Sequence, residues 1–324
     1  MAWRLRVVPE KTSIDFFRWQ WLTFGASLAA TVLSIVLVFT MGLNFGIDFR
    51  GGTTIRTEST QPVDVGAYRG ALSGLALGDV AITQVFDPTF RADQHVAQIR
   101  IGAQDGAEAV TPEMLQSVEA ALRAVDPAVT FTNVESVGPK ASAELMWTAI
   151  TAVLAATAGI VVYIWVRFEW QFALGAVAAL VHDVVVTIGV WALFQFKFDL
   201  TIVAALLTIL GYSINDTVVV FDRLRENLMK YKTMPLREVM NLSVNETLSR
   251  TVMTSGTTLI ALLALLVFGG DVIRGFALAI FIGVLLGTYS SVYVAKNIVL
   301  FLGVKRDWDR KSEGPSGTRF ATRP

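Results

Sequence analysis

The sequence predicts a mainly α-helical membrane protein with six transmembrane helices and one small α+β domain outside the bilayer. Of its 324 residues, 53% are hydrophobic and only 17% are charged, whereas ordinary soluble domains have about 25% charged residues. Apolar stretches of about 20 residues, long enough to cross the hydrocarbon core as a helix, recur six times. The spans are expected at residues 19–41, 145–166, 170–194, 200–221, 251–270 and 275–295.

The composition excludes several kinds of site. The 27 basic and 27 acidic residues cancel, so no net charge points to nucleic acid. The chain has no cysteine, which rules out disulfides, zinc–thiolate sites, iron–sulfur clusters and cysteine nucleophiles. The two histidines, His95 and His182, leave little for a histidine-built metal site. No nucleotide-binding loop of the GxxxxGKS/T type is present, and we expect neither a cofactor nor an enzymatic activity.

The first apolar stretch, 19–41, is interpreted as an uncleaved anchor and not as a signal peptide. Its apolar run is longer than a typical signal-peptide core, and a polar segment, residues 1–18, precedes it. That segment, the predicted cytoplasmic loop 222–250 and the tail carry many Lys and Arg residues, so the positive-inside rule places both termini in the cytoplasm. The tail, 305–324, is polar and is expected to be disordered.

The long segment between the first two spans, residues 42–144, is the predicted outside domain. Thr111 is suited to a helix N-cap and Pro112 to the first helical position. His95 lies in a strand and is interpreted as structural. Strands are expected at 53–58, 79–86, 95–101 and 128–135, and helices at 63–75 and 111–125. The order β-α-β-β-α-β is that of a ferredoxin-like sandwich.

The five remaining spans, within residues 145–304, contain the informative ionisable groups. A charge at mid-helix costs about 2.5–3.5 kcal/mol on insertion scales, and such residues usually have a function. Asp183 lies near the middle of the third span, and Asp216 lies in the fourth. Arg250 begins the fifth span and is followed by hydroxyl-bearing residues, namely Thr251, Thr254, Ser255, Thr257 and Thr258. In the sixth span, Gly283 and Gly287 favour close helix packing.

The residues alone leave two interpretations of these charges open. In the first, Asp216 takes up and releases a proton, Arg250 is its switching partner, and Ser and Thr side chains hold a water wire. In the second, Asp216 and Arg250 form an inert ion pair that only holds helices together. His182 and Asp183 could likewise bond to a neighbouring helix and do nothing more. As supporting polar residues within the spans we expect Asp183, His182, Ser213, Asn215 and Thr254.

Three motifs carry a resemblance to a known family. The segment GIDFRGGT at 46–53 follows the first span, VHDV at 181–184 lies in the third, and LTILGYSINDTVVVFDR at 207–223 occupies the fourth. Together they resemble the SecD/SecF family of bacterial protein-export membrane proteins, within the resistance–nodulation–division (RND) superfamily. Two features resemble the SecF branch more than the SecD branch. They are the sequence YSIND at 212–216, within the third motif, and the single small outside domain.

That resemblance implies an RND-type half of six spans with a periplasmic ferredoxin-like domain, in the bacterial inner membrane. It implies a heterodimer with SecD, association with the SecYEG channel, YajC as a further candidate partner, and a functional link to the motor SecA. The complex would use the proton-motive force to promote late steps in the export of unfolded polypeptide.

In the family, an aspartate and an arginine that match Asp216 and Arg250 are proposed to transfer protons, and the resemblance leaves proton and sodium coupling undistinguished. Two alternatives remain: half of an RND-type small-molecule efflux transporter, and a structural membrane scaffold.

Overall fold

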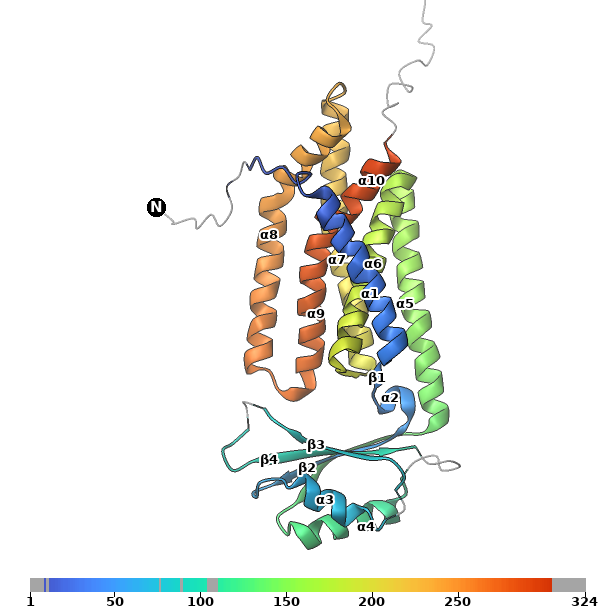
Figure 1. Ribbon diagram of the computed structural model, residues 1–324, viewed down its shortest axis with the longest axis vertical. Helices are drawn as coiled ribbons and strands as arrows, with labels where there is room; N and C mark the ends of the chain where they lie inside the picture. Colours follow the sequence, from blue (N-terminus) through green and yellow to red (C-terminus); the bar gives the residue numbers. More distant parts are fainter. Residues whose placement is uncertain (1–8, 10–11, 76, 88–89, 104–109, 305–324) are drawn as a thin grey trace, which may run out of the picture.

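The computed structural model describes residues 9, 12–75, 77–87, 90–103 and 110–304, and consists of a long helical bundle with a small sheet domain at one end (Figure 1). Within these residues, six helical stretches are long and apolar enough to cross a membrane, which confirms the six predicted spans. The predicted disorder of 305–324 falls outside the described residues, as does the segment 1–8.

Each span is one continuous helix, except that the last changes its winding. The helices are α1 (Gln20–Met41), α5 (Pro139–Arg167), α6 (Trp170–Phe194), α7 (Leu200–Lys230) and α8 (Leu236–Phe268). The last span joins α9 (Asp271–Ser290), a π-helical turn η1 (Ser291–Ala295) and α10 (Lys296–Leu302). Helix α7 packs against α5, α6, α8 and α9 and so lies at the centre of the bundle.

The segment predicted as the loop 222–250 is largely helical. Helix α7 continues to Lys230 and α8 begins at Leu236, so the two form a hairpin that extends beyond their apolar parts. The continuous apolar stretches end where the charged residues begin. Beyond them, buried apolar side chains still recur at helical spacing, namely Leu224, Leu228, Val239, Met240 and Val244. The hairpin therefore has a packed core of its own, which a hydropathy criterion does not detect.

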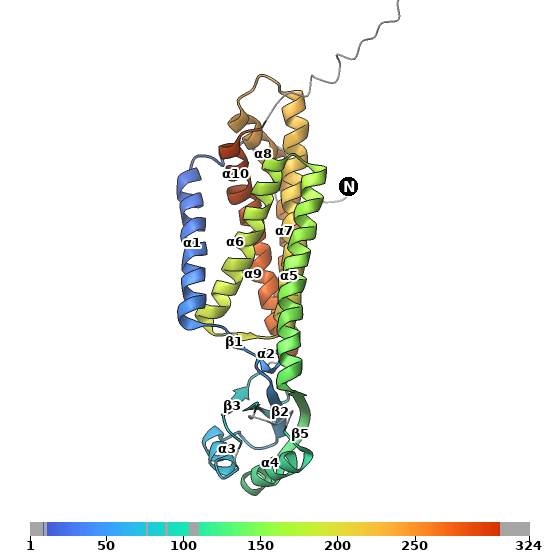
Figure 2. The ribbon, with the colours of Figure 1, turned by 90° about the vertical axis from the view of Figure 1, so that its right-hand side faces the viewer.

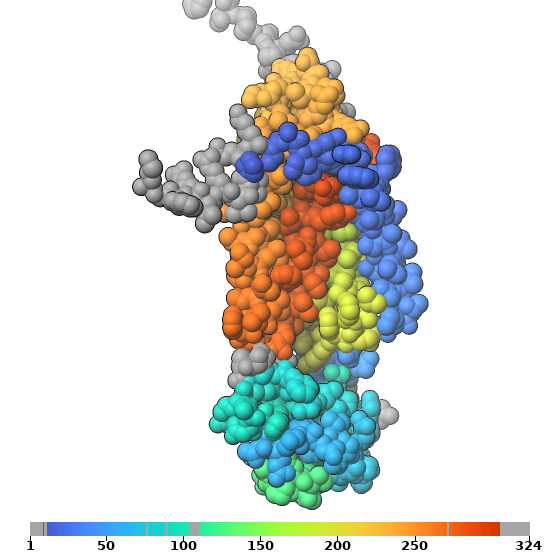
Figure 3. Space-filling view, turned by 60° about the vertical axis from the view of Figure 1, so that its left-hand side comes forward, coloured from blue at the N-terminus to red at the C-terminus, as the bar shows by residue number. Residues whose placement is uncertain are grey.

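The N-terminal segment crosses the bundle at the end opposite the sheet domain (Figure 3). Two asparagines one turn apart on α8 hold it: the Asn241 side chain accepts from the Phe16 amide at 2.9 Å, and the Asn245 side chain accepts from the Ile14 amide at 2.9 Å. Beneath the segment, the Lys296 ammonium donates to the Phe16 carbonyl and lies 3.7 Å from the centre of the Phe17 ring. This buried lysine thus ties the last span to the start of the chain.

The sheet domain has the predicted ferredoxin-like order. Its elements are β2 (Gly52–Ser59), α3 (Val65–Leu72), β3 (Val80–Val85), β4 (His95–Gly102), α4 (Pro112–Val125) and β5 (Thr130–Val137). All neighbouring strands are antiparallel in the order β3-β4-β2-β5. Helices α3 and α4 cover the face turned away from the bundle (Figure 2). As predicted, the Thr111 side chain caps α4, accepting from the Met114 amide at 3.3 Å.

The glycine motif after the first span connects the sheet domain to the bundle. It contains the short helix α2 (Ile47–Arg50), and next to it β1 (Asn44–Phe45) pairs in parallel with β6 (Lys197–Phe198). Gly52 has a φ of +118°, and a Cβ there would collide with the Ile101 carbonyl oxygen, so only glycine fits. The Asp48 carboxylate accepts from the Leu200 amide at 3.0 Å and so helps to cap α7.

The single tyrosine of the sheet domain gives a prediction about its stability. The Tyr68 hydroxyl donates to the buried Asp126 carboxylate at 2.8 Å, and burial, this hydrogen bond and the carboxylate charge raise the pKa of Tyr68 well above its ordinary value. The folded state therefore keeps a proton that the unfolded state loses above about pH 10, so stability is fully present below that pH and falls above it. We expect Tyr68→Phe to remove this alkaline loss and to cost about 1 kcal/mol at neutral pH.

The test uses the fragment 44–140, which we expect to fold alone because its strands and helices enclose their own core. Urea unfolding at rising pH measures the stability, and tyrosinate absorbance follows Tyr68, the only tyrosine in the fragment. A fragment without a cooperative transition, or one in which Tyr68 titrates like a free tyrosine, would contradict the prediction.

Candidate proton-transfer site

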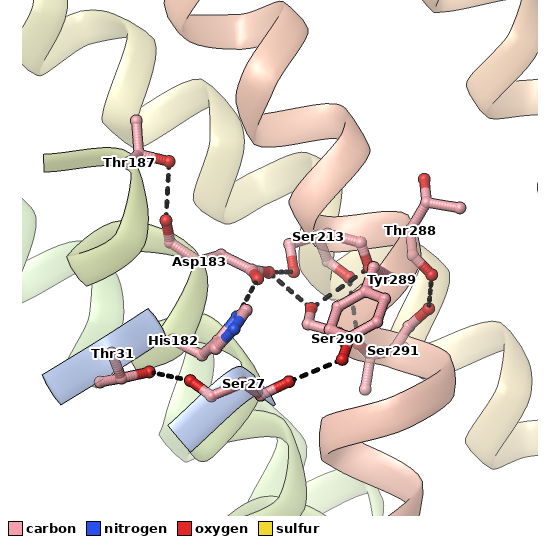
Figure 4. Close-up of polar contacts among 12 residues, drawn as sticks. Ser27, Thr31, His182, Asp183, Thr187, Ser213, Thr288, Tyr289, Ser290 and Ser291 are labelled. Atoms are coloured by element: carbon pink, nitrogen blue, oxygen red, sulfur yellow. Dashed lines mark hydrogen bonds and ion pairs between the residues drawn. The ribbon is translucent and has the colours of Figure 1, made fainter. Parts of the chain in front are cut away.

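Asp183 lies on α6, fully buried, inside a set of hydrogen bonds from three helices (Figure 4). One carboxylate oxygen is 2.9 Å from Nδ1 of His182. The other accepts from the hydroxyls of Ser213 on α7, at 2.6 Å, and Ser290 at the end of α9, at 2.7 Å. Both oxygens of the Asp183 carboxyl group therefore have hydrogen-bond partners.

Asp216 lies on α7, three residues after Ser213 and so on the same side of that helix. Its side chain is also buried. One carboxylate oxygen accepts from the Thr251 hydroxyl on α8 at 2.6 Å, and the other from the Ser291 hydroxyl at 2.9 Å. The two aspartates are thus held by neighbouring hydroxyls, with Ser290 on one and Ser291 on the other.

Close contact between α7 and α9 brings these groups together. A Cβ on Gly283 would collide with the Ile209 side chain, and one on Gly287 would lie 3.1 Å from the Cβ of Ser213. The two glycines therefore let the last span approach α7 closely, and the Ser291 hydroxyl reaches Asp216 on α7. Further hydroxyl groups lie nearer the sheet domain. The hydroxyl oxygens of Ser255 on α8 and Thr288 on α9 are 2.7 Å apart.

Arg250 does not belong to this buried cluster. Its side chain is exposed on α8, and in the described part of the chain it forms no ion pair or hydrogen bond with Asp216, although its charge acts on that carboxylate electrostatically. Asn215 and Thr254 are also exposed, and the Thr254 hydroxyl donates to carbonyls of its own helix. The structure therefore offers no support for an inert Asp216–Arg250 ion pair within this chain.

The structure brings together four of the residues singled out from the sequence, Asp183, His182, Ser213 and Asp216. It places Arg250, Asn215 and Thr254 on an outer face of the bundle instead. Sequence reasoning missed Ser290 and Ser291, although two consecutive serines within an apolar span are a visible signal.

Comparison with known proteins identifies the family. The SecD/SecF C-terminal family of protein export membrane proteins matches residues 117–305, and the SecD/SecF GG motif family matches residues 36–63. The protein translocase subunit SecF of Cereibacter sphaeroides is 71% identical over 99% of both chains. The chain belongs to the SecF family of protein translocase subunits. The SecF of Rhodobacter capsulatus is 67% identical over 99% of this chain and 98% of its own.

Two solved structures of SecDF share the fold of this SecF-family chain. The crystal structure of SecDF from Thermus thermophilus, a translocon-associated membrane protein, has a TM-score of 0.81 and 36% identity over 91% of this chain. A SecDF in a super-membrane-facing form has a TM-score of 0.67 and 37% identity over 96% of it. The chain spans only 39% and 41% of those two chains. The similarity therefore covers one part of each SecDF.

Proposed function

We propose that this chain is the SecF-type subunit of a proton-driven accessory complex of the Sec translocase in the bacterial inner membrane. It would pair with a SecD-type subunit and use the proton-motive force to promote late steps in the export of unfolded polypeptide. Membership in the SecF family, six spans and the sheet domain support a role in translocation.

The observation that carries proton coupling is the environment of Asp216. Both hydrogen bonds to its carboxylate come from neutral hydroxyls, and a hydroxyl can donate to a carboxylate or accept from a carboxylic acid. Both protonation states of Asp216 can therefore keep hydrogen-bond partners in the same place. Protonation of a carboxylate in a buried ion pair would instead leave its cationic partner without a compensating charge.

The outward-facing polar residues support a partner within the membrane. Three polar residues on the neighbouring helices α7 and α8 are exposed, namely Asn215, Arg250 and Thr254. Contact between lipid and the charge of Arg250 would be energetically unfavourable. A SecD-type half that covers this face with its own acidic residue would compensate Arg250. A further half is also supported by the length of the comparison structures, since each SecDF chain is more than twice as long as the part matched here.

We infer that both termini lie in the cytoplasm and the sheet domain in the periplasm, from the distribution of Lys and Arg. In this orientation one charge moved across 100 mV is worth about 2.3 kcal/mol, enough to shift a conformational equilibrium about fiftyfold. Strand β5 lies at an edge of the sheet, and most of its residues are exposed. It could accept an extended segment of exported polypeptide as an added strand.

SecYEG, YajC and a functional link to SecA complete the proposed set of partners. Half of an efflux transporter is the second candidate that the RND resemblance allows, but the family membership favours translocation. A structural scaffold is the third, and the absence of an Asp216–Arg250 ion pair in the described residues disfavours it.

The test measures export of a secretory protein into membrane vesicles containing this chain and its SecD-type partner. We expect the two subunits to copurify, and we expect dissipation of the gradient to remove the part of export that depends on this chain. A protonophore and a sodium ionophore, applied separately, distinguish the two ions. Unchanged export in both cases would contradict ion coupling, and purification without any SecD-type subunit would contradict the heterodimer.

A further inference from the structure

Two consecutive residues of the last span hold the two buried aspartates. Ser290 is the last residue of α9 and donates to Asp183, while Ser291 is the first residue of the π-helical turn η1 and donates to Asp216. Both serines are themselves fully buried. The two carboxylates are thus connected through a single peptide unit.

Each serine has a second acceptor within its own helix. The Ser290 hydroxyl oxygen lies 3.3 Å from the Gly287 carbonyl, and that of Ser291 lies 3.1 Å from the Thr288 carbonyl. A serine hydroxyl has one proton, so it donates either to its carboxylate or to its carbonyl at any one time. When the carboxylate gains a proton, it can donate to the serine oxygen, and the serine proton is then free to turn to the carbonyl.

We propose that Ser290 and Ser291 are positioning residues that couple Asp183 to Asp216 through the start of the π-helical turn. The inference rests on the proposed proton uptake by Asp216. Protonation of Asp216 reverses its hydrogen bond with Ser291, whose hydroxyl then bonds to the Thr288 carbonyl. This change alters the backbone next to Ser290 and with it the hydrogen bond to Asp183.

The π-helical turn makes this point of the span adaptable. A π turn carries one extra residue relative to an α-helix and is frequently found at functional sites. It ends at Ala295, next to Lys296, which bonds to the N-terminal segment through the Phe16 carbonyl. A rearrangement of the hydrogen bonds at Ser290 and Ser291 could therefore be transmitted along the π-helical turn to Lys296.

The experiment compares Ser291→Ala and Ser290→Ala in the full complex by gradient-dependent export and by infrared spectroscopy of the carboxyl groups. The Asp183 band is assigned by its loss in Asp183→Asn. We expect Ser291→Ala to shift the Asp183 band, although Ser291 does not touch Asp183, and to lower export about tenfold, the effect of one hydrogen bond to a charged group. Ser291→Thr, which keeps the hydroxyl, should restore both.

The matched control is Ser142→Ala, which removes a buried hydroxyl on α5 that donates to the Pro139 carbonyl at 2.9 Å and contacts neither carboxylate. It should leave the Asp183 band and export unchanged. If the alanine variants do not assemble, Ser291→Cys and Ser290→Cys, which keep a side chain of similar shape but donate weakly, carry the same comparison.

An Asp183 band that does not respond to Ser291→Ala or Ser291→Cys would overturn the coupling. So would a loss of export in the Ser290→Ala/Ser291→Ala double variant equal to the product of the single losses, because residues in one coupled unit are not additive. Normal export by Asp216→Asn would instead overturn the proposed function itself, which keeps the two failures distinguishable.

Discussion

Asp216→Asn is expected to abolish gradient-dependent export while the protein remains inserted and folded. Asparagine has nearly the shape of aspartate, and its side-chain oxygen can still accept from Thr251 or Ser291. It cannot ionise, so uptake and release of a proton stop. We expect export to fall at least about a hundredfold, the usual contribution of a positioned proton-transfer group. Export into vesicles with an imposed gradient is the measurement, with the amount of inserted protein checked.

Asp222→Asn is the matched control, since it makes the same change on the same helix. Asp222 is half exposed and pairs with Arg167 at 3.2 Å, and exposed pairs of this kind contribute little stability. We expect near-normal export from this variant. Wild-type export by Asp216→Asn would remove its role as proton carrier, and Asp183 would become the next candidate.

The helical bundle follows from the sequence because its signals are local. An apolar stretch of about 20 residues specifies a spanning helix wherever it occurs. The sheet domain is also specified by local signals. Apolar and polar residues alternate along its strands, and Thr111 caps α4 within one helical turn. The α7–α8 hairpin escaped prediction since its buried face, including Leu228 and Val244, is interrupted by many charges.

The site was only half predictable, because the direction of a side chain depends on how helices pack. Asp216 and Arg250 both stand out in the sequence, yet one faces the bundle interior and the other faces outward. Ser290 and Ser291 gain their significance from contacts with α6 and α7, which the sequence of the last span does not contain. Residue type marked the ionisable groups, and only the three-dimensional packing identified their hydrogen-bond partners.

Arg250→Gln is expected to abolish gradient-dependent export with little effect on the stability of this chain. The arginine is exposed and makes no ion pair with Asp216 in the described residues, so its replacement should change the free energy of unfolding by no more than about 0.5 kcal/mol. Its charge is nevertheless close enough to act on Asp216, and we expect proton release to depend on it. Arg250→Lys, which keeps the charge, should retain part of the export.

The double variant Asp216→Asn/Arg250→Gln separates a functional pair from a structural one. An inert buried ion pair would make each single change cost about 3–5 kcal/mol and the double change nearly neutral. Because the two side chains share no hydrogen bond, we expect their stability effects to add within about 0.5 kcal/mol instead. Export by the double variant should be no lower than by Asp216→Asn alone, since residues that serve one step are not additive in activity. Unfolding of the purified chain and export by the complex measure the two quantities. A double variant that regains both stability and gradient-dependent export would show that the pair is structural, and proton transfer would then have to depend on Asp183 and its serines.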